Sequence, residues 1–372
     1  MTSYRRIAMA LSLAALVGSV AWAAGSVRGF GGPGSRGIEL PSSYNAYHFK
    51  DKADSSIGWM HLIFLEDGGW IQILFGLANM GPYKKAPSVL AIYAGPDGTK
   101  YRCYEQWSGA DHFVEPPPNK YAIQIDKSSF GGRYPNFYAK INNGGCRGEI
   151  TFTSEVPSYT QGRGIATFTE VGGEAYEWRA TMLSPRAKAR GYLEFPERRI
   201  TIEGEAYLEE VSGDLAIPSL ADRFYIFHAI NGPYSIHLFD IVVDKKNFGN
   251  GHVRMFNVTK DDKIIMGTPN VHFTPKGGRR HPKSGISVPT HFDLSARDGS
   301  TRLTGTVKMV RILEAVDILS QTPRFIRMFG SFIAGTPWHF KVMANYDLVL
   351  KEGENDIPLT GTGYEEIHFY DR

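Results

Sequence analysis

Two neighbouring carboxyl groups are the first candidates for chemistry in this chain. Glu209 and Glu210 follow Tyr207 near the end of a strand-like run. In a strand the two glutamates point to opposite faces, and Tyr207 lies on the face of Glu209, where it can hydrogen-bond the carboxyl group. A glutamate that is buried, or that lies beside a second carboxylate, has a raised pKa and can donate a proton. The pattern predicts a proton donor at Glu209, and the alternative is an exposed acidic strand end.

A second candidate acid lies in the strand-like run 234–243. Asp240 falls on an apolar face of this run, where an unpaired carboxylate is costly. It is therefore either a reserve catalytic acid or the structural partner of an arginine such as Arg223. His237, in the same run, is a candidate ligand contact.

Aromatic residues two positions apart predict the walls of a binding site. Trp59 and His61 share one strand face, and Trp178 shares another with Tyr176. Such pairs suit a barrel interior that holds a flat or polyene ligand. The alternative interpretation of His61 is a core or surface histidine with no ligand.

No metal site and no organic cofactor is predicted. The 11 histidines are scattered, without a His-x-Glu or His-x-x-x-His cluster, and two cysteines without paired histidines do not make a zinc site. The Gly131-Gly132 and Gly277-Gly278 pairs lack the strand-to-helix setting of a phosphate loop.

The 2 cysteines are compatible with one disulfide. Cys103 lies in the strand-like segment 100–107 and Cys146 in a glycine-rich turn. A bridge between them would close a loop of roughly 40 residues and would form only in an oxidising compartment. The pattern leaves the bridged and the free state open.

The elements that must position these residues are predicted to be strands. Aromatic residues make up 13% of the chain and there are 41 glycines, a mixture typical of strands joined by tight turns. Runs such as 59–65 and 70–77, separated by Gly68-Gly69, predict antiparallel hairpins. Strands do not alternate with helices, so a parallel α/β sheet is not expected. Short helices are predicted at Ile312–Ile318 and around Pro323–Ile333.

One short phrase occurs twice. The pattern Gly-x-small-Tyr-x-Glu occupies positions 204–209 and again 361–366. A chain of 372 residues exceeds the size of one hydrophobic core. We therefore predict two related β domains, 27–212 and 213–372, with the crossing near 211–224; the alternative is a chance match of a short pattern.

The first 26 residues predict export. Arg5 and Arg6 precede an apolar run from Ile7 to Val20, which Ala21-Trp22-Ala23 follows as a cleavage signal. The segment 1–26 is thus predicted to be a signal peptide, and the mature protein periplasmic or secreted. An uncleaved membrane anchor is the alternative, although the run is shorter than the roughly 20 residues that span a bilayer.

The charge balance argues against nucleic-acid binding. The chain has 41 Lys and Arg against 38 Asp and Glu, a formal net charge of only +3. One basic segment, Lys276–Lys283, could contact anionic lipid headgroups at a membrane surface, or it is a solvated loop.

Several short motifs resemble a known group of proteins. In chain order they are Trp59-x-x-x-x-Phe64-x-x-Asp67-Gly68, Trp70-Ile71-Gln72-Ile73, the Pro96-Asp97-Gly98 turn and Gly-x-small-Tyr-x-acid. This order resembles the two-domain lipocalin-like superfamily of bacterial carotenoid 1,2-hydratases, fungal decalin-forming Diels-Alderases and yeast survival-factor lipid-binding proteins. The resemblance implies an all-β fold of two tandem lipocalin-like β-barrel or β-sandwich domains, with an apolar pocket between or within them.

The resemblance also implies two functions. Hydratase-like members tend to read Gly-x-Gly-Tyr-x-Asp-His at the end of the first unit, and here Glu209 takes the acidic position while Glu210 replaces the histidine. The chain therefore keeps a carboxyl group able to protonate a C=C bond, but it lacks the neighbouring imidazole of the hydratase motif. The chain is therefore expected to bind an isoprenoid, sterol or related lipid, either as a hydratase (lyase), isomerase or cyclase, or as a carrier without catalysis.

Overall fold

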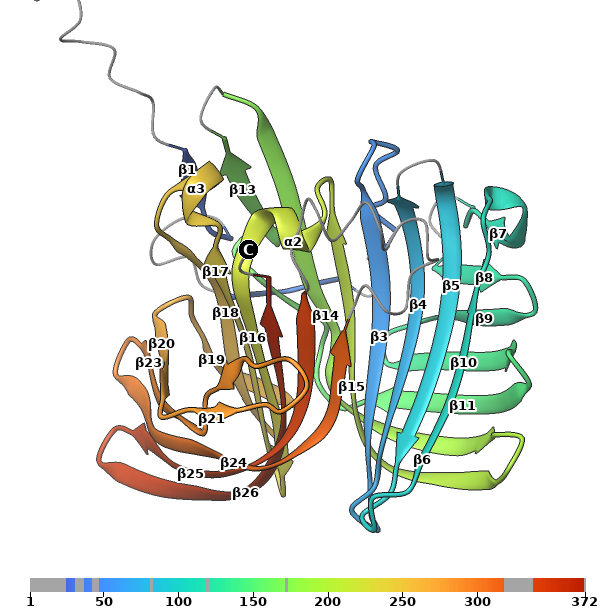
Figure 1. Cartoon of the computed structure of the whole chain (residues 1–372). Coiled ribbons are helices and arrows are strands. Elements are labelled where there is room, and N and C mark those ends of the chain that lie inside the picture. The colour runs from blue at the N-terminus through green and yellow to red at the C-terminus, as the bar shows by residue number, and fades with distance from the viewer. Residues whose placement is uncertain are drawn as a thin grey trace, which may run out of the picture.

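The computed structural model describes residues 25–30, 37–41, 47–80, 83–117, 121–170, 173–317 and 337–370. These residues are almost entirely strand, and the strands form two strongly curled sheets that lie side by side (Figure 1). The predicted all-β fold is confirmed.

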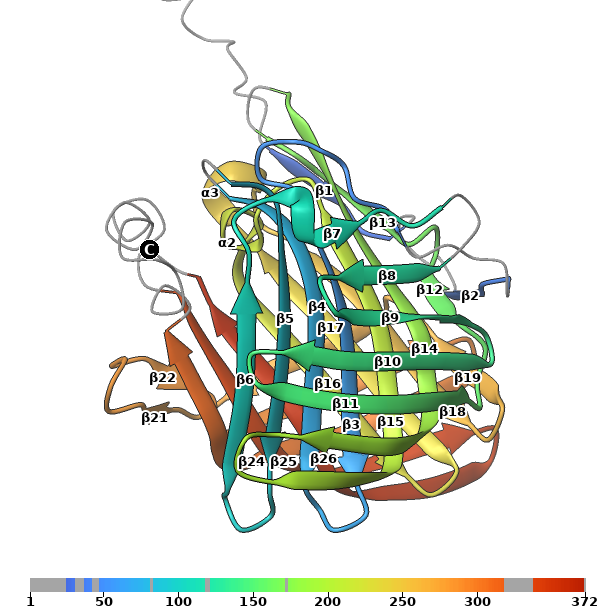
Figure 2. The same ribbon diagram turned by 90° about the vertical axis from the view of Figure 1, so that its right-hand side faces the viewer.

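The first sheet contains the strands of the first half. In the described residues they are β1 Ser26–Arg28, β2 Gly37–Glu39, β3 Ser56–Leu65, β4 Trp70–Met80, β5 Tyr83–Ala94, β6 Lys100–Gln106, β7 Phe113–Val114, β8 Ala122–Ile125, β9 Ser128–Arg133, β10 Asn136–Asn143, β11 Cys146–Ser154, β12 Tyr159–Gln161, β13 Ile165–Thr169, β14 Ala175–Glu194 and β15 Arg199–Gly213. Strands β8–β11 cross in front of β3–β5, because the sheet curls back over itself (Figure 2).

The second sheet is built from later strands: β16 Ala221–Asn231, β17 Tyr234–Val243, β18 His252–Lys260, β19 Lys263–Gly267, β20 Val271–Lys276, β23 His291–Asp298, β24 Thr301–Asp317, β25 Trp338–Glu352 and β26 Asn355–Phe369. A separate small hairpin pairs β21 Arg279–Arg280 with β22 Ser287–Val288. The short helices among the described residues are the 3-10 turn η1 Ala110–His112, α2 Ile217–Leu220 and α3 Lys245–Phe248.

The two sheets share one strand order. The order β6-β5-β4-β3-β15-β14-β11-β10-β9 in the first matches β19-β18-β17-β16-β26-β25-β24-β23-β20 in the second. The two copies of the repeated phrase lie in β15 and β26, which hold the same place. Each of these strands pairs antiparallel with the long strand before it and with an early strand of its own sheet.

Side chains point alternately to the two faces of β15, and this alternation explains the order of residues in the repeated phrase. Ala206 and Leu208 face the core of the first half, while Tyr207 faces a core shared by the two halves. Gly204 is required where β15 approaches β3, because a Cβ atom there would lie 2.1 Å from the carbonyl oxygen of Phe64.

Three hydrophobic clusters hold the molecule together. One fills the first half around Phe75 and Phe130, and a second fills the other half around Phe273 and Phe292. The third draws residues from both halves, including Trp178. Burial of this apolar surface is the main favourable term for the packing of one half on the other.

One predicted helix is wrong. Residues Ile312–Asp317 continue strand β24, which pairs with β25 along its length. Register shifts between Met309 and Arg311, and between Ile312 and Glu314, break the alternation of the strand, so its apolar residues imitate helical spacing. The other predicted helix, around Pro323–Ile333, lies outside the described residues, as does the predicted signal segment up to residue 24.

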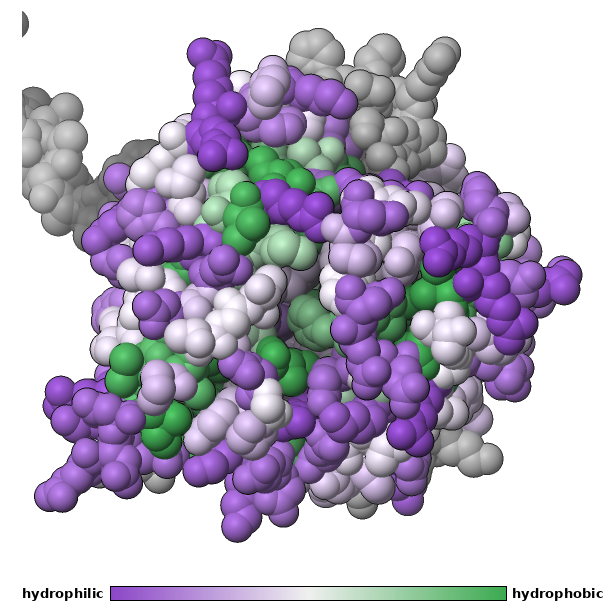
Figure 3. All heavy atoms as spheres, turned by 90° about the horizontal axis from the view of Figure 1, so that it is seen from below, coloured by the Kyte–Doolittle hydropathy of each residue, from purple (hydrophilic) through white to green (hydrophobic). Residues whose placement is uncertain are grey.

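Cys103 and Cys146 form a disulfide, with their Cα atoms 6.1 Å apart. Cys146 is the first residue of β11, so the bond joins the edge strand β6 to β11 across the curled sheet. Among the described residues, no helix has the length and apolar character needed to cross a membrane. Hydrophilic side chains cover most of the face seen from below, with smaller apolar areas between them (Figure 3).

Candidate functional site

A cavity of about 480 Å³ lies between the two halves. Strands β3–β6 and β15 line it from the first half, and β16, β17 and β24–β26 from the second. Its apolar lining includes Met60, Leu74, Leu90, Ile92, Val211, Ile217, Phe224, Ile226 and Phe239. Its polar lining includes Gln72, Arg102, Glu209, Glu314, His339, Lys341, Glu366 and His368. A mostly apolar cavity with a few converging polar groups is typical of a small-molecule site.

Another hollow of about 490 Å³ lies near Gly37, Tyr159 and Asp298. The residues lining it come from β2, β12, β19 and the turn that joins β23 to β24, and none of the predicted site residues is among them. We therefore place the candidate site in the cavity between the halves.

Glu209 faces this cavity as a buried carboxyl group. The Tyr207 hydroxyl donates a hydrogen bond to its Oε2 at 2.8 Å, as the strand alternation predicts. Burial, with repulsion from Glu366 and Glu210, raises the pKa of Glu209 to about 8, although the hydrogen bond from Tyr207 opposes the shift. Glu209 is thus mostly protonated at pH 7 and can donate a proton into the cavity.

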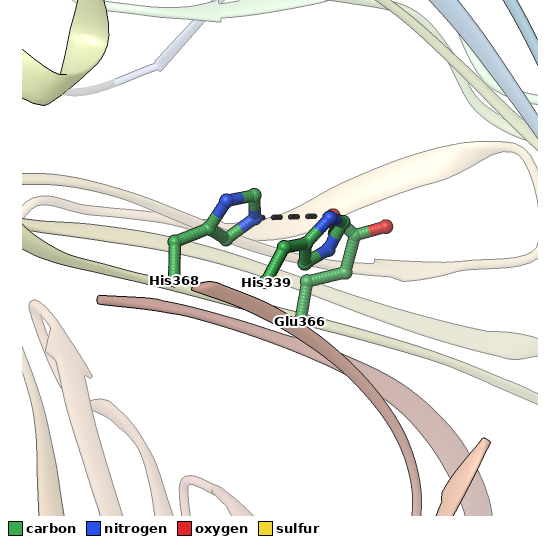
Figure 4. Close-up of side chains that lie close together, drawn as sticks. All are labelled: His339, Glu366 and His368. Atoms are coloured by element: carbon green, nitrogen blue, oxygen red, sulfur yellow. Dashed lines mark hydrogen bonds and ion pairs between the residues drawn. The ribbon is translucent and has the colours of Figure 1, made fainter. Parts of the chain in front are cut away.

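The second copy of the phrase supplies the matching pair. The Tyr364 hydroxyl donates to Oε1 of Glu366 at 2.5 Å, and Gln72 donates to the same oxygen at 3.1 Å. The Nε2 atoms of His339 and His368 lie 2.9 and 3.2 Å from Oε2 (Figure 4). Burial alone would raise the pKa of Glu366, but these two imidazoles hold the pKa well below its usual range.

The two equivalent carboxyl groups therefore carry opposite charge states. Glu366 is ionised because several groups surround it, and its negative charge disfavours ionisation of Glu209. The result is a proton donor and a carboxylate facing one cavity, a pairing suited to proton transfer.

His237 packs on the ring of Tyr207 and does not line the cavity. Its Nε2–H donates to the carbonyl oxygen of Pro185 at 2.6 Å, and its Nδ1 lies 3.0 Å from Nδ1 of His228. Both imidazoles pack on the Tyr207 ring, with centroids 4.5 and 4.2 Å away. Burial lowers the pKa of His237 well below its usual value and that of His228 to about 3, so both are neutral and hold the tyrosine in place.

The predicted aromatic walls lie elsewhere. Trp59 and His61 share a face, but that face looks into the packed core of the first half. The His61 ring lies 4.0 Å from that of Phe130, and burial lowers the pKa of His61 to about 3. Trp178 belongs to the core between the halves and packs on Phe224, which does line the cavity.

Asp240 is a structural group. Its carboxylate lies 3.2 Å from Nε of Arg254 and 2.7 Å from Nδ1 of His252, on the neighbouring strand β18. Glu210 points away from Glu209, as alternation predicts, and its carboxylate lies 3.6 Å from Nδ1 of His48. Neither lines the cavity.

Sequence reasoning missed Glu366, His339 and His368. The repeated phrase held a usable signal, because Glu366 occupies the position in the second copy that Glu209 occupies in the first. Glu366 and His368 are two residues apart and so share a strand face. His339 carried no local signal, since only the pairing of β25 with β26 brings it opposite His368.

Comparison with known proteins places the chain in a family. The model of the Svf1 family matches residues 119–370, well over half of the chain. The chain belongs to the Svf1 family. No curated protein matches this Svf1-family chain by sequence.

Solved structures share the fold of this Svf1-family protein along nearly its whole length. CghA in complex with Sch210972 is 12% identical, with a TM-score of 0.63 over 93% of this chain and 98% of the other. A candidate AttH protein from Nitrosomonas europaea is 14% identical, with a TM-score of 0.60 over 90% and 97%. Kievitone hydratase from Nectria haematococca is 13% identical, with a TM-score of 0.56 over 92% and 98%. The predicted resemblance to the two-domain lipocalin-like superfamily is confirmed.

Proposed function

We propose that this Svf1-family protein binds an isoprenoid, sterol or related lipid in the cavity between its halves, and that Glu209 protonates a C=C bond of this ligand. The observation that carries the proposal is the pairing of a protonated Glu209 with an ionised Glu366 at one mostly apolar cavity. Protonation of an alkene needs a carboxyl group that still holds its proton and is shielded from bulk water, and this arrangement supplies one.

In the proposed reaction, Glu209 acts first as the proton donor and Glu366 then acts on the cation that forms. The proton of Glu209 moves to one alkene carbon, and the positive charge that develops on the other carbon is stabilised by the negative charge of Glu366. Addition of water, which then loses a proton to Glu366, gives hydration, and loss of a neighbouring C–H proton to Glu366 gives isomerisation. Attack by a second double bond moves the positive charge to a new carbon, and loss of a proton from its neighbour to Glu366 completes cyclisation. Glu209 regains its proton from Glu366 or from solvent.

The names of two fold relatives support an active cavity of this kind. One is a hydratase, and the other was crystallised with the small molecule Sch210972. The predicted signal segment 1–26 supports the further proposal that the protein acts outside the cytoplasm.

A carrier without catalysis is the second candidate. The observation that favours it is Glu210, which replaces the histidine of the hydratase motif and points away from the cavity. A carrier would use the same cavity and the same apolar walls, but it would not need the protonated state of Glu209.

Mass spectrometry of the protein purified from its native host tests ligand binding. Leu74→Trp would fill the cavity, because Leu74 lines it, whereas Val349→Trp adds the same ring at a position that is 39% exposed and outside it. We expect an apolar molecule to co-purify with the wild type and with Val349→Trp, and to be depleted at least tenfold in Leu74→Trp. Equal amounts in all three proteins, or none in any, would contradict the proposal.

A further inference from the structure

The geometry points to a binding site for a divalent transition-metal ion, formed by His339, Glu366 and His368 at the polar end of the cavity. The ligand atoms that these residues offer all lie within 4.8 Å of one another. The two imidazoles lie beside the Glu366 carboxylate and turn Nε2 toward it (Figure 4). This inference makes no use of Glu209 and does not rest on the proposed function; a bound ion would neutralise Glu366, so it competes with the role that the proposed function gives to that carboxylate.

The spacing of these atoms is close to that of a metal coordination sphere. Zinc binds imidazole nitrogen and carboxylate oxygen at about 2.0–2.2 Å, so neighbouring ligands in a tetrahedral site lie roughly 3.3 Å apart. The distances from Oε2 of Glu366 are 2.9 Å to His339 and 3.2 Å to His368. The two imidazole nitrogens lie within 4.8 Å of each other, so an ion would draw them together by rotation of the side chains.

The backbone sets these positions before any ion binds. His339 on β25 lies directly opposite His368 on β26 in the antiparallel register, and Glu366 is on the same face of β26. The two rings stack with centroids 3.9 Å apart. Because both strands lie inside the sheet, each with a neighbour on either side, the three ligand side chains stand on a rigid support.

Neighbouring groups orient the ligands as in known metal sites. The Tyr370 hydroxyl lies 2.9 Å from Nδ1 of His368, so the ring nitrogen that faces away from Glu366 has a hydrogen-bond partner. Tyr364 and Gln72 hold Oε1 of Glu366 and leave Oε2 turned to the imidazoles. Such contacts fix the orientation of metal-binding side chains and raise metal affinity.

Charge and ligand type indicate which ions fit. The nearby cation Lys341 is already paired with Glu314, with Nζ 2.9 Å from Oε2, so its charge is largely balanced. Two imidazoles and one carboxylate suit zinc, cobalt, nickel or copper ions, whereas magnesium and calcium favour sites made of oxygen alone. The side chains of His339 and His368 are 16% and 13% exposed, and both line the cavity, which gives an ion a route to them.

Metal titration of the purified whole chain tests the inference. After treatment with a chelator and its removal, we expect about one equivalent of Co²⁺ to bind, with the visible absorption of a nitrogen and oxygen site, and Zn²⁺ to displace it. The variants His368→Asn and His339→Asn should each weaken Co²⁺ binding at least tenfold. The exposed His272 serves as the matched control, and His272→Asn should bind as the wild type does.

Each variant is checked for the wild-type circular dichroism spectrum, and His368→Gln replaces His368→Asn if that protein does not fold. No uptake by the wild type, or unchanged uptake in both cavity variants, would overturn the inference. The proposed function can fail separately, because Leu74→Trp tests the apolar wall and leaves all three metal ligands in place.

Discussion

Two carboxyl groups at equivalent positions have opposite properties because their neighbours differ. Glu209 accepts a hydrogen bond from Tyr207, whereas Glu366 is contacted by Tyr364, Gln72 and two imidazoles. Each added donor stabilises the charged form of a carboxyl group, and burial without donors stabilises the neutral form. At the scale of single residues, the surroundings set which member of the pair holds a proton.

The raised pKa of Glu209 predicts a pH dependence of stability. The folded chain keeps the Glu209 proton up to a pH of about 8, while the unfolded chain releases it near 4.5. The folded state therefore binds more protons between these values, and stability from this group falls as pH rises, by about 1.4 kcal/mol per pH unit. Glu209→Gln should lose this slope when free energies of unfolding are measured in urea at pH 5.5, 6.5 and 7.5.

The matched control is Glu203→Gln, on the exposed part of the same strand. It should keep the slope of the wild type. Parallel curves for the wild type and Glu209→Gln would show that Glu209 is ionised in the folded protein.

At the scale of elements, local patterns predicted the hairpins but not the docking of the halves. The runs 59–65 and 70–77 correspond to β3 and β4, because the Gly68-Gly69 turn and the many β-branched and aromatic residues mark them in the sequence. The bulges in β24 disturb the alternation on which strand prediction rests, and for this reason the end of that strand was predicted to be a helix.

The candidate site was also predicted only in part, because the alternation of side chains describes one strand at a time. Alternation correctly put Tyr207 beside Glu209 and Glu210 on the other face. It could not say whether the face of Trp59 and His61 meets the packed core or the cavity, because that depends on how each sheet curls. Glu366 and its histidines approach Glu209 only when one half packs on the other, and local sequence does not encode that contact.

The disulfide between β6 and β11 is expected to stabilise the curled first sheet. It closes a loop with a sequence separation of 43 residues, which corresponds to about 2–4 kcal/mol of stability through the unfolded chain. The double variant Cys103→Ser, Cys146→Ser should be less stable by this amount in urea unfolding. Adding a reductant should destabilise the wild type by a similar amount and leave the variant unchanged; a wild type that does not respond would contradict the prediction.

At the scale of the whole molecule, two curled sheets with one strand order lie side by side (Figure 1). Residues of both sheets line a shared cavity. Each half contributes one tyrosine and glutamate pair to the region where they meet. The two sheets together thus form a site that neither contains alone, and differences in neighbouring side chains separate the charge states of the two glutamates.

Export is a property of the whole chain that a direct measurement can test. The segment Ala21-Trp22-Ala23 predicts a mature N-terminus near Ala24. N-terminal sequencing of the protein purified from its host should find that end in the fraction outside the cytoplasm. An intact Met1 on a cytoplasmic protein would contradict it.

The central claim is that Glu209 donates a proton to a bound apolar ligand. The most direct test is Glu209→Gln, assayed for turnover and separately for retention of the molecule extracted from the native protein. Glu203→Gln, which changes an exposed residue of the same strand, is the control and should behave as the wild type. We predict that Glu209→Gln retains the ligand and loses turnover by roughly 10² to 10⁴, the usual effect of removing a general acid. Unchanged turnover in a folded Glu209→Gln protein, or no turnover by the wild type, would contradict the claim.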